Sequence, residues 1–336
     1  MMKRLLVGLV VTGLALGLIW PSGFVAAEEK LSVPHYGVAE FSLEYPTGGL
    51  KDPFSMVKLR AVVTTPSGKQ HNVGGFYAGP NKIQLRYMAA EVGDYSLAVS
   101  VSGPSGPRET SFAFTSRPSD LPGLLRRHPE NSYRLMDEKT SQLVNLQGFN
   151  NTWDIDPNNP HGGQLGNYIE DGVWTPLETY FKTYARAGFN AFRWIPGNSK
   201  KFSIYTRDQY QLEKADELLR TAKEQGYHVI LALFPANGYQ GDAPTNPQQE
   251  KRLKQRIDEV VNRYVAYVDL WELTNESYSK SISDAWLRYT AEYLRSIDPY
   301  QRLILNSNPR PDDWTYLDAR APHFYDNYLD EKSKID

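Results

Sequence analysis

Residues 229–234 read Val229-Ile230-Leu231-Ala232-Leu233-Phe234, an unbroken apolar run. A strand with one face in water alternates apolar and polar residues, whereas a continuously apolar strand is buried on both faces. Strands of that kind belong to parallel sheets that are covered by helices on their faces. The run therefore predicts a central strand of a parallel sheet.

Similar apolar runs lie on both sides of this stretch and alternate with amphipathic helical patterns. The predicted strands are Val144–Phe149, Phe189–Ile195, Val229–Phe234, Val268–Thr274, Leu303–Ser307 and His323–Tyr328. The predicted helices are Thr175–Ala187, Asp208–Glu224, Pro247–Tyr264, Asp284–Arg295 and the short Asp312–Leu317. Repeated β-α units predict parallel strands with helical crossovers. Because no Gly-rich phosphate loop follows the first strand, we predict an α/β (β/α)₈ TIM-type barrel and not a nucleotide-binding sheet.

This barrel is expected to be incomplete. A whole (β/α)₈ barrel takes about 250 residues, and residues 141–336, which we assign to it, are fewer. The pattern contains about six of the eight units. We therefore expect a truncated or partial gene product that stops after the sixth strand.

The first half of the chain has a different pattern, with short alternating runs separated by turns rich in Pro, Gly and Ser. The predicted strands are Val38–Tyr45, Val57–Thr65, Lys82–Tyr87, Tyr95–Val101 and Glu109–Phe114. Several short strands at this spacing, without a helical period, predict an all-β, Ig-like sandwich over residues 30–117. Residues 118–140 are predicted to be a linker, because Arg117–Pro129 contains three prolines.

The N-terminus is predicted to be a signal peptide, residues 1–27. Lys3 and Arg4 form a basic start, Leu5–Trp20 is apolar, and Val25–Ala27 provides small residues for cleavage after Ala27. The apolar stretch is shorter than the roughly 20 residues of a membrane span. We expect a secreted, extracellular protein that does not contact the membrane after cleavage; the alternative is an uncleaved anchor.

Composition excludes several classes of protein. The chain has no Cys, which excludes thiol nucleophiles, thiolate zinc sites and iron–sulfur clusters. Its formal net charge is −2, and loss of the signal peptide makes the charge more negative, which argues against a nucleic-acid partner. We expect neither a cofactor nor a metal, since the acidic residues near Asp154 lack the spacing of a calcium loop. The oligomeric state is left open.

The most informative feature for function is Asn275-Glu276, which ends a predicted buried strand. Reactive groups of (β/α)₈ barrels lie at the C-terminal ends of the strands. A general acid must be protonated near neutral pH, so its carboxyl group has to be partly desolvated or close to another carboxylate. A barrel mouth provides both conditions. The alternative is that Glu276 stabilises the start of the next helix through its dipole.

Residues 143–328 resemble the clan-A (β/α)₈ glycoside hydrolases, especially the cellulase-like glycoside hydrolase family 5. That group has an Arg on strand 2, an Asn-Glu pair ending strand 4 and a His-x-Tyr on strand 6, and this chain has Arg193, Asn275-Glu276 and His323-Phe324-Tyr325. The resemblance implies a retaining double-displacement mechanism. It also implies a nucleophilic Glu at the end of strand 7, a strand that these residues do not contain.

The resemblance further implies a role for each matching residue. Glu276 would be the acid/base, and Asn275 would hydrogen-bond the sugar 2-hydroxyl. Arg193 would keep the nucleophile ionised, Tyr325 would donate to the nucleophile, and His323 would line the sugar subsite. Three alternatives stay open: Arg193 as a structural ion-pair partner, His323 as a core histidine, and Tyr325 as a packing residue.

Sugar rings stack on flat apolar side chains, and the chain is rich in aromatic residues. The candidate substrate-binding residues are Trp153, Trp174, Trp194 and Asn237. Two other polar residues are expected to be structural. His228 stands at the beginning of its strand, away from the mouth, and Glu272 lies four residues deeper than Glu276 as an acid of the barrel interior.

The first half of the chain carries a second resemblance. Pro53-Phe54, Leu59–Gly68, Gly74–Tyr77 and Gly93–Tyr95 are similar to the uncharacterised β-sandwich domain that often precedes cellulase-like barrels. Such a domain could bind polysaccharide or brace the barrel, and we favour bracing.

Together these observations predict a secreted glycoside hydrolase that cleaves O-glycosidic bonds of a β-linked polysaccharide, although this fragment by itself is expected to be inactive. The alternative is a non-catalytic carbohydrate-binding protein on a degenerate barrel. A transglycosylase is a third possibility, whereas a serine esterase would need a Gly-x-Ser-x-Gly motif that the sequence lacks. The sugar, the linkage and the choice between endo and exo action are left open.

Overall fold

A computed structural model describes residues 31–151, 169–170, 173–174, 177–196, 207–234, 243–277, 282–307 and 315–323. Residue contacts divide the chain into two units. The first consists of Met1–Gly123 with Asp258–Tyr267, and the second consists of Leu124–Ile257 with Val268–Asp336.

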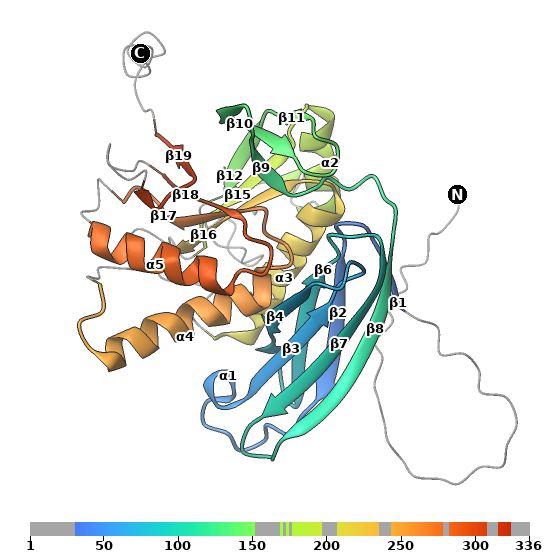
Figure 1. The fold of residues 1–336 in the computed structure, drawn as a ribbon, viewed down its shortest axis with the longest axis vertical. Coiled ribbons are helices and arrows are strands. Elements are labelled where there is room, and N and C mark those ends of the chain that lie inside the picture. The colour runs from blue at the N-terminus through green and yellow to red at the C-terminus, as the bar shows by residue number, and fades with distance from the viewer. Residues whose placement is uncertain are drawn as a thin grey trace, which may run out of the picture. The chain divides into compact units, whose positions relative to one another are not determined.

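The N-terminal unit contains two β-sheets (Figure 1). The larger has the order β1-β8-β7-β3-β4, from Leu31–Pro34 (β1), Lys58–Thr64 (β3), Gln70–Gly74 (β4), Gly93–Ser102 (β7) and Arg108–Arg117 (β8). The smaller has the order β2-β6-β5, from Val38–Glu44 (β2), Phe76–Tyr77 (β5) and Lys82–Met88 (β6). A short helix, Pro53–Met56 (α1), precedes β3. Pairing is antiparallel except between β1 and β8.

Aromatic side chains fill the space between these sheets. Alternate residues of β7 are buried, as the period of two requires for a strand with one wet face. Tyr95 stacks on Phe114 with ring centroids 4.5 Å apart, and Phe41 of the smaller sheet reaches Phe114 at 5.9 Å. Rings from both sheets therefore share one core, and the predicted β-sandwich is confirmed.

The second unit begins with a small sheet of order β11-β10-β9, formed by Leu125–His128 (β9), Asn131–Asp137 (β10) and Leu143–Val144 (β11). Strands β9 and β10 therefore lie within the segment that we predicted to be a linker, 118–140. Its prolines lie before β9 and in the β9–β10 turn, where they do not interrupt pairing. Arg126 fixes the sheet to the main body by donating to the carbonyl groups of Tyr300 and Gln301, at 3.1 and 2.8 Å.

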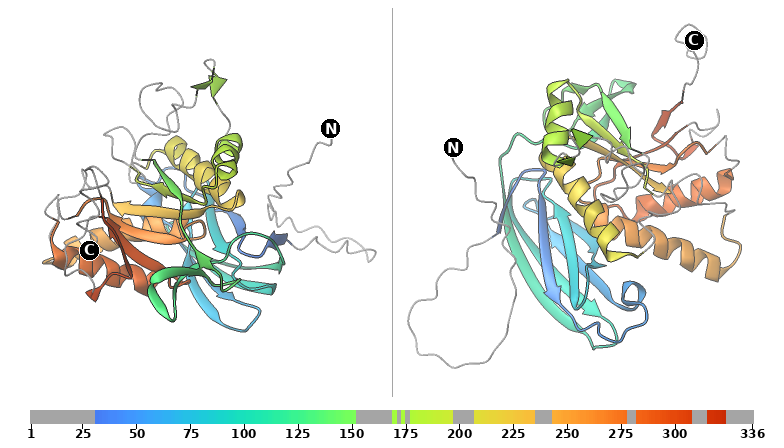
Figure 2. Two further views of the ribbon diagram at one scale, coloured as in Figure 1. Left: turned by 90° about the horizontal axis from the view of Figure 1, so that it is seen from above. Right: turned by 180° about the vertical axis from the view of Figure 1, so that it is seen from behind.

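The centre of the second unit is a six-stranded sheet with the order β12-β15-β16-β17-β18-β19 and only parallel pairs. Its strands are Gly148–Asn151 (β12), Ala191–Trp194 (β15), His228–Phe234 (β16), Leu270–Thr274 (β17), Leu303–Ser307 (β18) and Ala319–Ala321 (β19). The helices that follow its strands are Leu177–Arg186 (α2), Gln209–Glu224 (α3), Pro247–Tyr264 (α4) and Asp284–Ile297 (α5), of which α4 belongs to this unit up to Ile257. A hairpin pairs Ile169–Glu170 (β13) with Val173–Trp174 (β14). This curled, incomplete TIM-type barrel confirms the predicted fold class (Figure 2).

Two predicted strands are displaced along the chain. The first was predicted at 144–149, but Leu143–Val144 pairs with β10 and the barrel strand is Gly148–Asn151. The sixth was predicted at 323–328, of which 324–328 lie outside the described residues, and the described strand that pairs with β18 is Ala319–Ala321. Strands of three or four residues give a weak periodic signal, so pairing partners decide their bounds. Residues 312–314 of the predicted helix 312–317 lie outside the described residues.

Local signals explain where the helices begin and end. The Asp208 carboxylate accepts a hydrogen bond from Gln211 N (3.1 Å) at the start of α3, and Ser283 Oγ accepts from Trp286 N (3.2 Å) at the start of α5. Gly188 follows α2 with φ +90°, a backbone conformation that glycine adopts without strain. Among the described residues, no helix is both long and apolar enough to cross a membrane.

The two faces of the parallel sheet carry different side chains. Phe149 packs on the side of α2, where its ring lies 4.2 Å from Tyr184, while the opposite face is lined by Leu270, Leu303 and Leu305. Leu125 of the small sheet packs on these leucines, so the β9–β11 sheet covers the lower part of the inner face. The polar residues of the same face lie above this apolar layer, nearer the C-terminal ends of the strands.

A buried polar cluster stands at the opposite, N-terminal end of the strands. Lys223 Nζ donates to Asp269 Oδ1 (2.7 Å), and Asp269 Oδ2 accepts from Val229 N (2.9 Å). His228 is buried beside them, and within the described residues its Nδ1 has no hydrogen-bond partner. Burial is the main cause that lowers the pKa of His228 below 6.5; Lys223 acts in the same direction, and Asp269 and Asp137 oppose it.

This cluster predicts an acid-sensitive fold. Below pH 6.5 the unfolded chain binds a proton at His228 more readily than the folded chain does, so protonation favours unfolding. The free energy of unfolding should fall as the pH drops from 6.5 toward the lower pKa, by at most about 1.4 kcal/mol per pH unit for this group. Denaturation titrations between pH 8 and pH 5, on wild type and on His228→Gln, would measure the slope. Equal slopes in both proteins would contradict the prediction.

Candidate active site

The polar layer of the inner face is built around an ion pair between Arg193 of β15 and Glu272 of β17. Arg193 Nε donates to Glu272 Oε2 at 2.7 Å, and Nη2 donates to Oε1 at 2.6 Å. The Glu272 side chain is fully buried and that of Arg193 is 15% exposed. Charge-assisted bidentate pairs of this kind fix both side chains in one geometry. Glu272 is thus an interior acid, as the sequence indicated, and Arg193 makes the structural ion pair that was its alternative role.

Arg193 also orients Asn275, which follows the end of β17. Arg193 Nη2 donates to Asn275 Oδ1 at 2.9 Å, and Ser307 Oγ lies 3.4 Å from the same oxygen. A guanidinium group can only donate, so the side-chain oxygen of Asn275 must face it. The amide nitrogen of Asn275, which makes no hydrogen bond to any described residue, is then available to donate to a hydroxyl group of a ligand.

Glu276 stands at the rim, immediately after Asn275. Its Oε1 lies 3.0 Å from Nδ1 of His323, which follows the end of β19. The Glu276 and His323 side chains are 18% and 20% exposed, so this carboxyl group is partly desolvated and partly exposed. Its backbone has φ +53°, an uncommon conformation for a residue with a side chain, and its N–H donates to Ser307 Oγ at 2.9 Å.

The structure therefore brings together four of the residues singled out in the sequence, although they come from three different strand ends. They are Arg193, Asn275, Glu276 and His323. Parallel strands end at one edge of a sheet, and this explains how residues up to 130 positions apart in the sequence meet.

Other predicted residues lie outside the described part of the chain. Tyr325, Trp153 and Asn237 are among them, and for Trp174 only the backbone in β14 is described.

Trp194 requires a correction. Its side chain is fully buried on the face opposite to Arg193, beside the equally buried Phe192, so it cannot stack on a sugar. Successive residues of a strand point to opposite faces, and only one of the pair Arg193 and Trp194 can face the site.

Sequence reasoning did not assign a role to Asn306 and Ser307, which end β18. Both side chains are fully buried and both bond to the segment that contains Asn275 and Glu276. The available signal was their place at a C-terminal strand end, next to the strand that carries Glu276.

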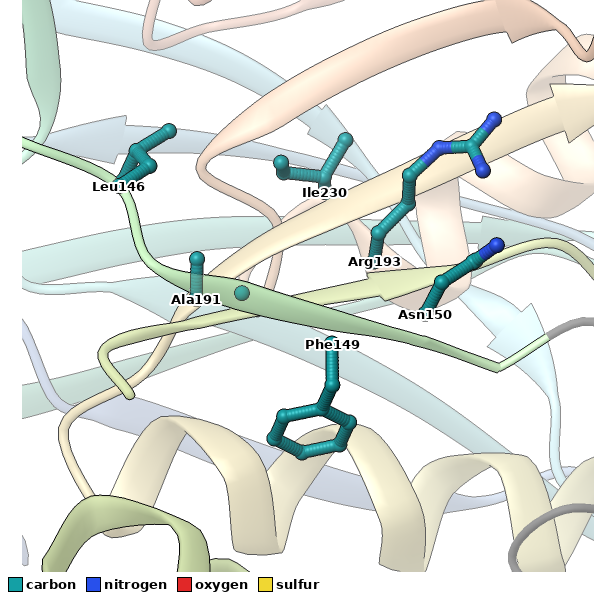
Figure 3. A pocket seen from close by; sticks show the side chains of 7 residues that line it. Leu146, Phe149, Asn150, Ala191, Arg193 and Ile230 are labelled. Atoms are coloured by element: carbon teal, nitrogen blue, oxygen red, sulfur yellow. The ribbon is translucent and has the colours of Figure 1, made fainter. Parts of the chain in front are cut away.

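A cavity of about 240 Å³ lies beside the ion pair, between β12, β15 and β16. Its lining residues are Leu146, Gly148, Phe149, Asn150, Ala191, Arg193 and Ile230. Figure 3 shows Arg193 and Asn150 pointing to one side of the strands and Phe149 to the other. Asn150 is thus a further polar side chain on the face that carries Arg193. Within the described residues, no group of three or more acidic or His side chains is arranged to hold a metal ion.

Residues 137–331 match the family Cellulase (glycosyl hydrolase family 5), and this match spans more than half of the chain. The chain belongs to this family. Residues 32–102 match a domain of unknown function, DUF5060. The resemblance drawn from Arg193, Asn275-Glu276 and His323 is confirmed at the level of the family, and the β-sandwich in front of the barrel is confirmed as a separate domain type.

Several solved structures are similar to this chain, and one of them has a TM-score above 0.5. A candidate glycoside hydrolase from Bacteroides vulgatus has a TM-score of 0.61 at 18% identity, with 85% of this chain and 58% of that chain covered. A β-glucuronidase from Parabacteroides merdae has a TM-score of 0.41 at 13% identity, with 89% and 35% covered. A family 5 glycoside hydrolase from Bacteroides vulgatus has a TM-score of 0.37 at 15% identity, with 56% and 40% covered. The chain thus spans less than two thirds of the length of these proteins. No curated protein matches it.

Proposed function

We propose that this family 5 protein is a secreted glycoside hydrolase that cleaves O-glycosidic bonds of a β-linked polysaccharide with retention of configuration. The observation that carries the proposal is the group at the strand ends. The partly exposed Glu276 carboxyl contacts His323, and it stands next to Asn275, whose amide is oriented by Arg193. This arrangement offers a proton donor and a hydroxyl-binding group at adjacent positions.

In this mechanism Glu276 first protonates the oxygen of the leaving group and later removes a proton from the attacking water. Asn275 donates from its amide nitrogen to the sugar 2-hydroxyl, an interaction that becomes stronger in the transition state. His323 orients the Glu276 carboxyl through the contact between its Nδ1 and Glu276 Oε1. Tyr325, Trp153, Trp174 and Asn237 remain proposed contacts of the nucleophile or the sugar.

The second carboxylate of a retaining enzyme lies about 5–5.5 Å from the acid/base. The family places this nucleophile on the strand after the sixth, which is not among the described residues. Arg193 is suited to hold it: Nε and Nη2 are committed to described partners, whereas Nη1 bonds to no described residue. Glu272 is an unsuitable substitute, because both of its oxygens accept from Arg193 and its side chain is fully buried.

The proposal is tested with a protein that contains these residues and a complete barrel, incubated with a panel of soluble β-linked polysaccharides. We expect hydrolysis of at least one of them, and proton NMR of the first product should show the β-anomer. An α-anomer would exclude the retaining mechanism. Binding without hydrolysis would instead favour the alternative of a carbohydrate-binding protein.

A further inference from the structure

The last two residues of β18 fasten the segment that carries Glu276. Thr274 N donates to Asn306 Oδ1 at 3.0 Å, and Asn306 Nδ2 donates to Ser277 Oγ. Between these two anchors, Glu276 N donates to Ser307 Oγ at 2.9 Å. Asn306 therefore holds the segment on both sides of Glu276, while Ser307 holds Glu276 itself.

The backbone at Glu276 needs such support. Its φ of +53° lies in the left-handed region, which is unfavourable for residues other than glycine because Cβ approaches the carbonyl oxygen. Conformations of this kind persist where the surrounding structure fixes them, and they concentrate at functional sites. The direction in which the Glu276 carboxyl leaves the chain is set by this backbone conformation.

The Ser307 hydroxyl uses its full hydrogen-bonding capacity within the candidate site. A hydroxyl group donates once and accepts twice. Ser307 Oγ accepts from Glu276 N (2.9 Å) and from Arg193 Nη2 (3.3 Å), and it donates toward Asn275 Oδ1 (3.4 Å). The side chain is fully buried, so water does not compete for these bonds. One oxygen atom thus connects three residues of the candidate site.

We propose that Ser307 is a positioning residue that fixes the backbone of Glu276 and thereby aims its carboxyl group at the glycosidic oxygen. Asn306 supports it by anchoring the flanking Thr274 and Ser277. The inference rests on the proposed function only in its last step, the action of Glu276 as acid/base. The fastening of the backbone by Ser307 is independent of that step.

The test uses a protein with the complete barrel and the variants Ser307→Ala and Ser307→Thr, with Ser296→Ala on the exposed side of α5 as a matched control. With a substrate that has a poor leaving group, Ser307→Ala should lower kcat by about 10- to 100-fold with KM changed little, since small misplacements of catalytic groups have effects of this size. An activated aryl glycoside should be affected much less. Ser307→Thr keeps the hydroxyl and should recover most of the rate.

A second measurement does not depend on activity. Hydrogen exchange at the Glu276 amide should be at least about ten times faster in Ser307→Ala, because its acceptor is lost. Ser296→Ala should leave it unchanged. If the alanine variant does not fold, Ser307→Cys, whose sulfur is a weak acceptor of similar size, takes its place.

Unchanged kcat together with unchanged exchange at Glu276 would overturn the proposal. Faster exchange with an equal loss of rate on both substrates would also overturn it, because the effect of Ser307 would then not depend on protonation of the leaving group by Glu276. If the wild-type protein hydrolyses nothing, the proposed function fails, and the exchange measurement alone then decides whether Ser307 holds Glu276.

Discussion

Glu272→Gln is expected to lower the free energy of unfolding of the second unit by about 3–5 kcal/mol, the usual cost of breaking a buried ion pair by removing one partner. The substitution keeps the shape of the side chain but removes its charge. The Arg193 guanidinium, 15% exposed and bonded to both Glu272 oxygens, would then be left largely buried beside a neutral amide. Structural consequences would extend to Asn275, which depends on Arg193 for its orientation.

Urea denaturation followed by tryptophan fluorescence measures this change. Every Trp after the predicted cleavage site lies beyond Gly123, so the signal reports on the second unit. Glu292→Gln, an exposed acid on α5, is the matched control and should stay within about 0.5 kcal/mol of wild type. A double variant, Arg193→Met with Glu272→Met, removes both charges and should recover much of the loss. A decrease below about 1 kcal/mol for Glu272→Gln would show that the pair is not needed for the fold.

Glu276→Gln in a protein with the complete barrel should lower kcat by about 10²–10⁴-fold on substrates with poor leaving groups, the usual contribution of general acid catalysis. The amide cannot give a proton to the departing oxygen. Activated leaving groups depart from aryl glycosides without a proton. The rate of bond cleavage in these substrates should therefore fall far less.

The pH dependence supplies an independent readout for the same variant. The basic limb of a bell-shaped profile reports loss of the proton from the catalytic acid, so this limb should disappear in Glu276→Gln. Glu292→Gln should keep the wild-type profile. If both kinds of substrate lose the same factor, Glu276 is not the acid, and the contact with His323 has a structural purpose.

Much of the fold could be predicted from residue patterns. Helix α4 and strand β18 have the predicted bounds, and α3 begins one residue after its predicted start at Asp208 and ends at Glu224 as predicted. These elements have long periodic patterns or strong end signals. The β9–β11 sheet was missed because its strands are short and only weakly alternating, so their stability comes from pairing and from packing of Leu125 on the inner face.

The candidate site could be predicted only in part. Asn275, Glu276 and His323 were identified from their order along the chain, and the structure brings them together at the strand ends. The prediction that Trp194 binds the sugar was wrong, because it relied on residue type alone. Successive strand residues point to opposite faces, so the alternation that places Arg193 on the inner face places Trp194 among buried side chains on the other.

The sequence by itself determined the two domains, the parallel order of the barrel strands and the presence of a carboxyl group at the end of the fourth. Those properties follow from local patterns of apolar residues, since periodicity and turn signals act over a few positions. Only the tertiary structure decided that Arg193 pairs with Glu272 and that Ser307 holds the backbone of Glu276. These contacts join residues 31 to 79 positions apart, and their geometry depends on the register and curvature of the sheet, which no local pattern encodes.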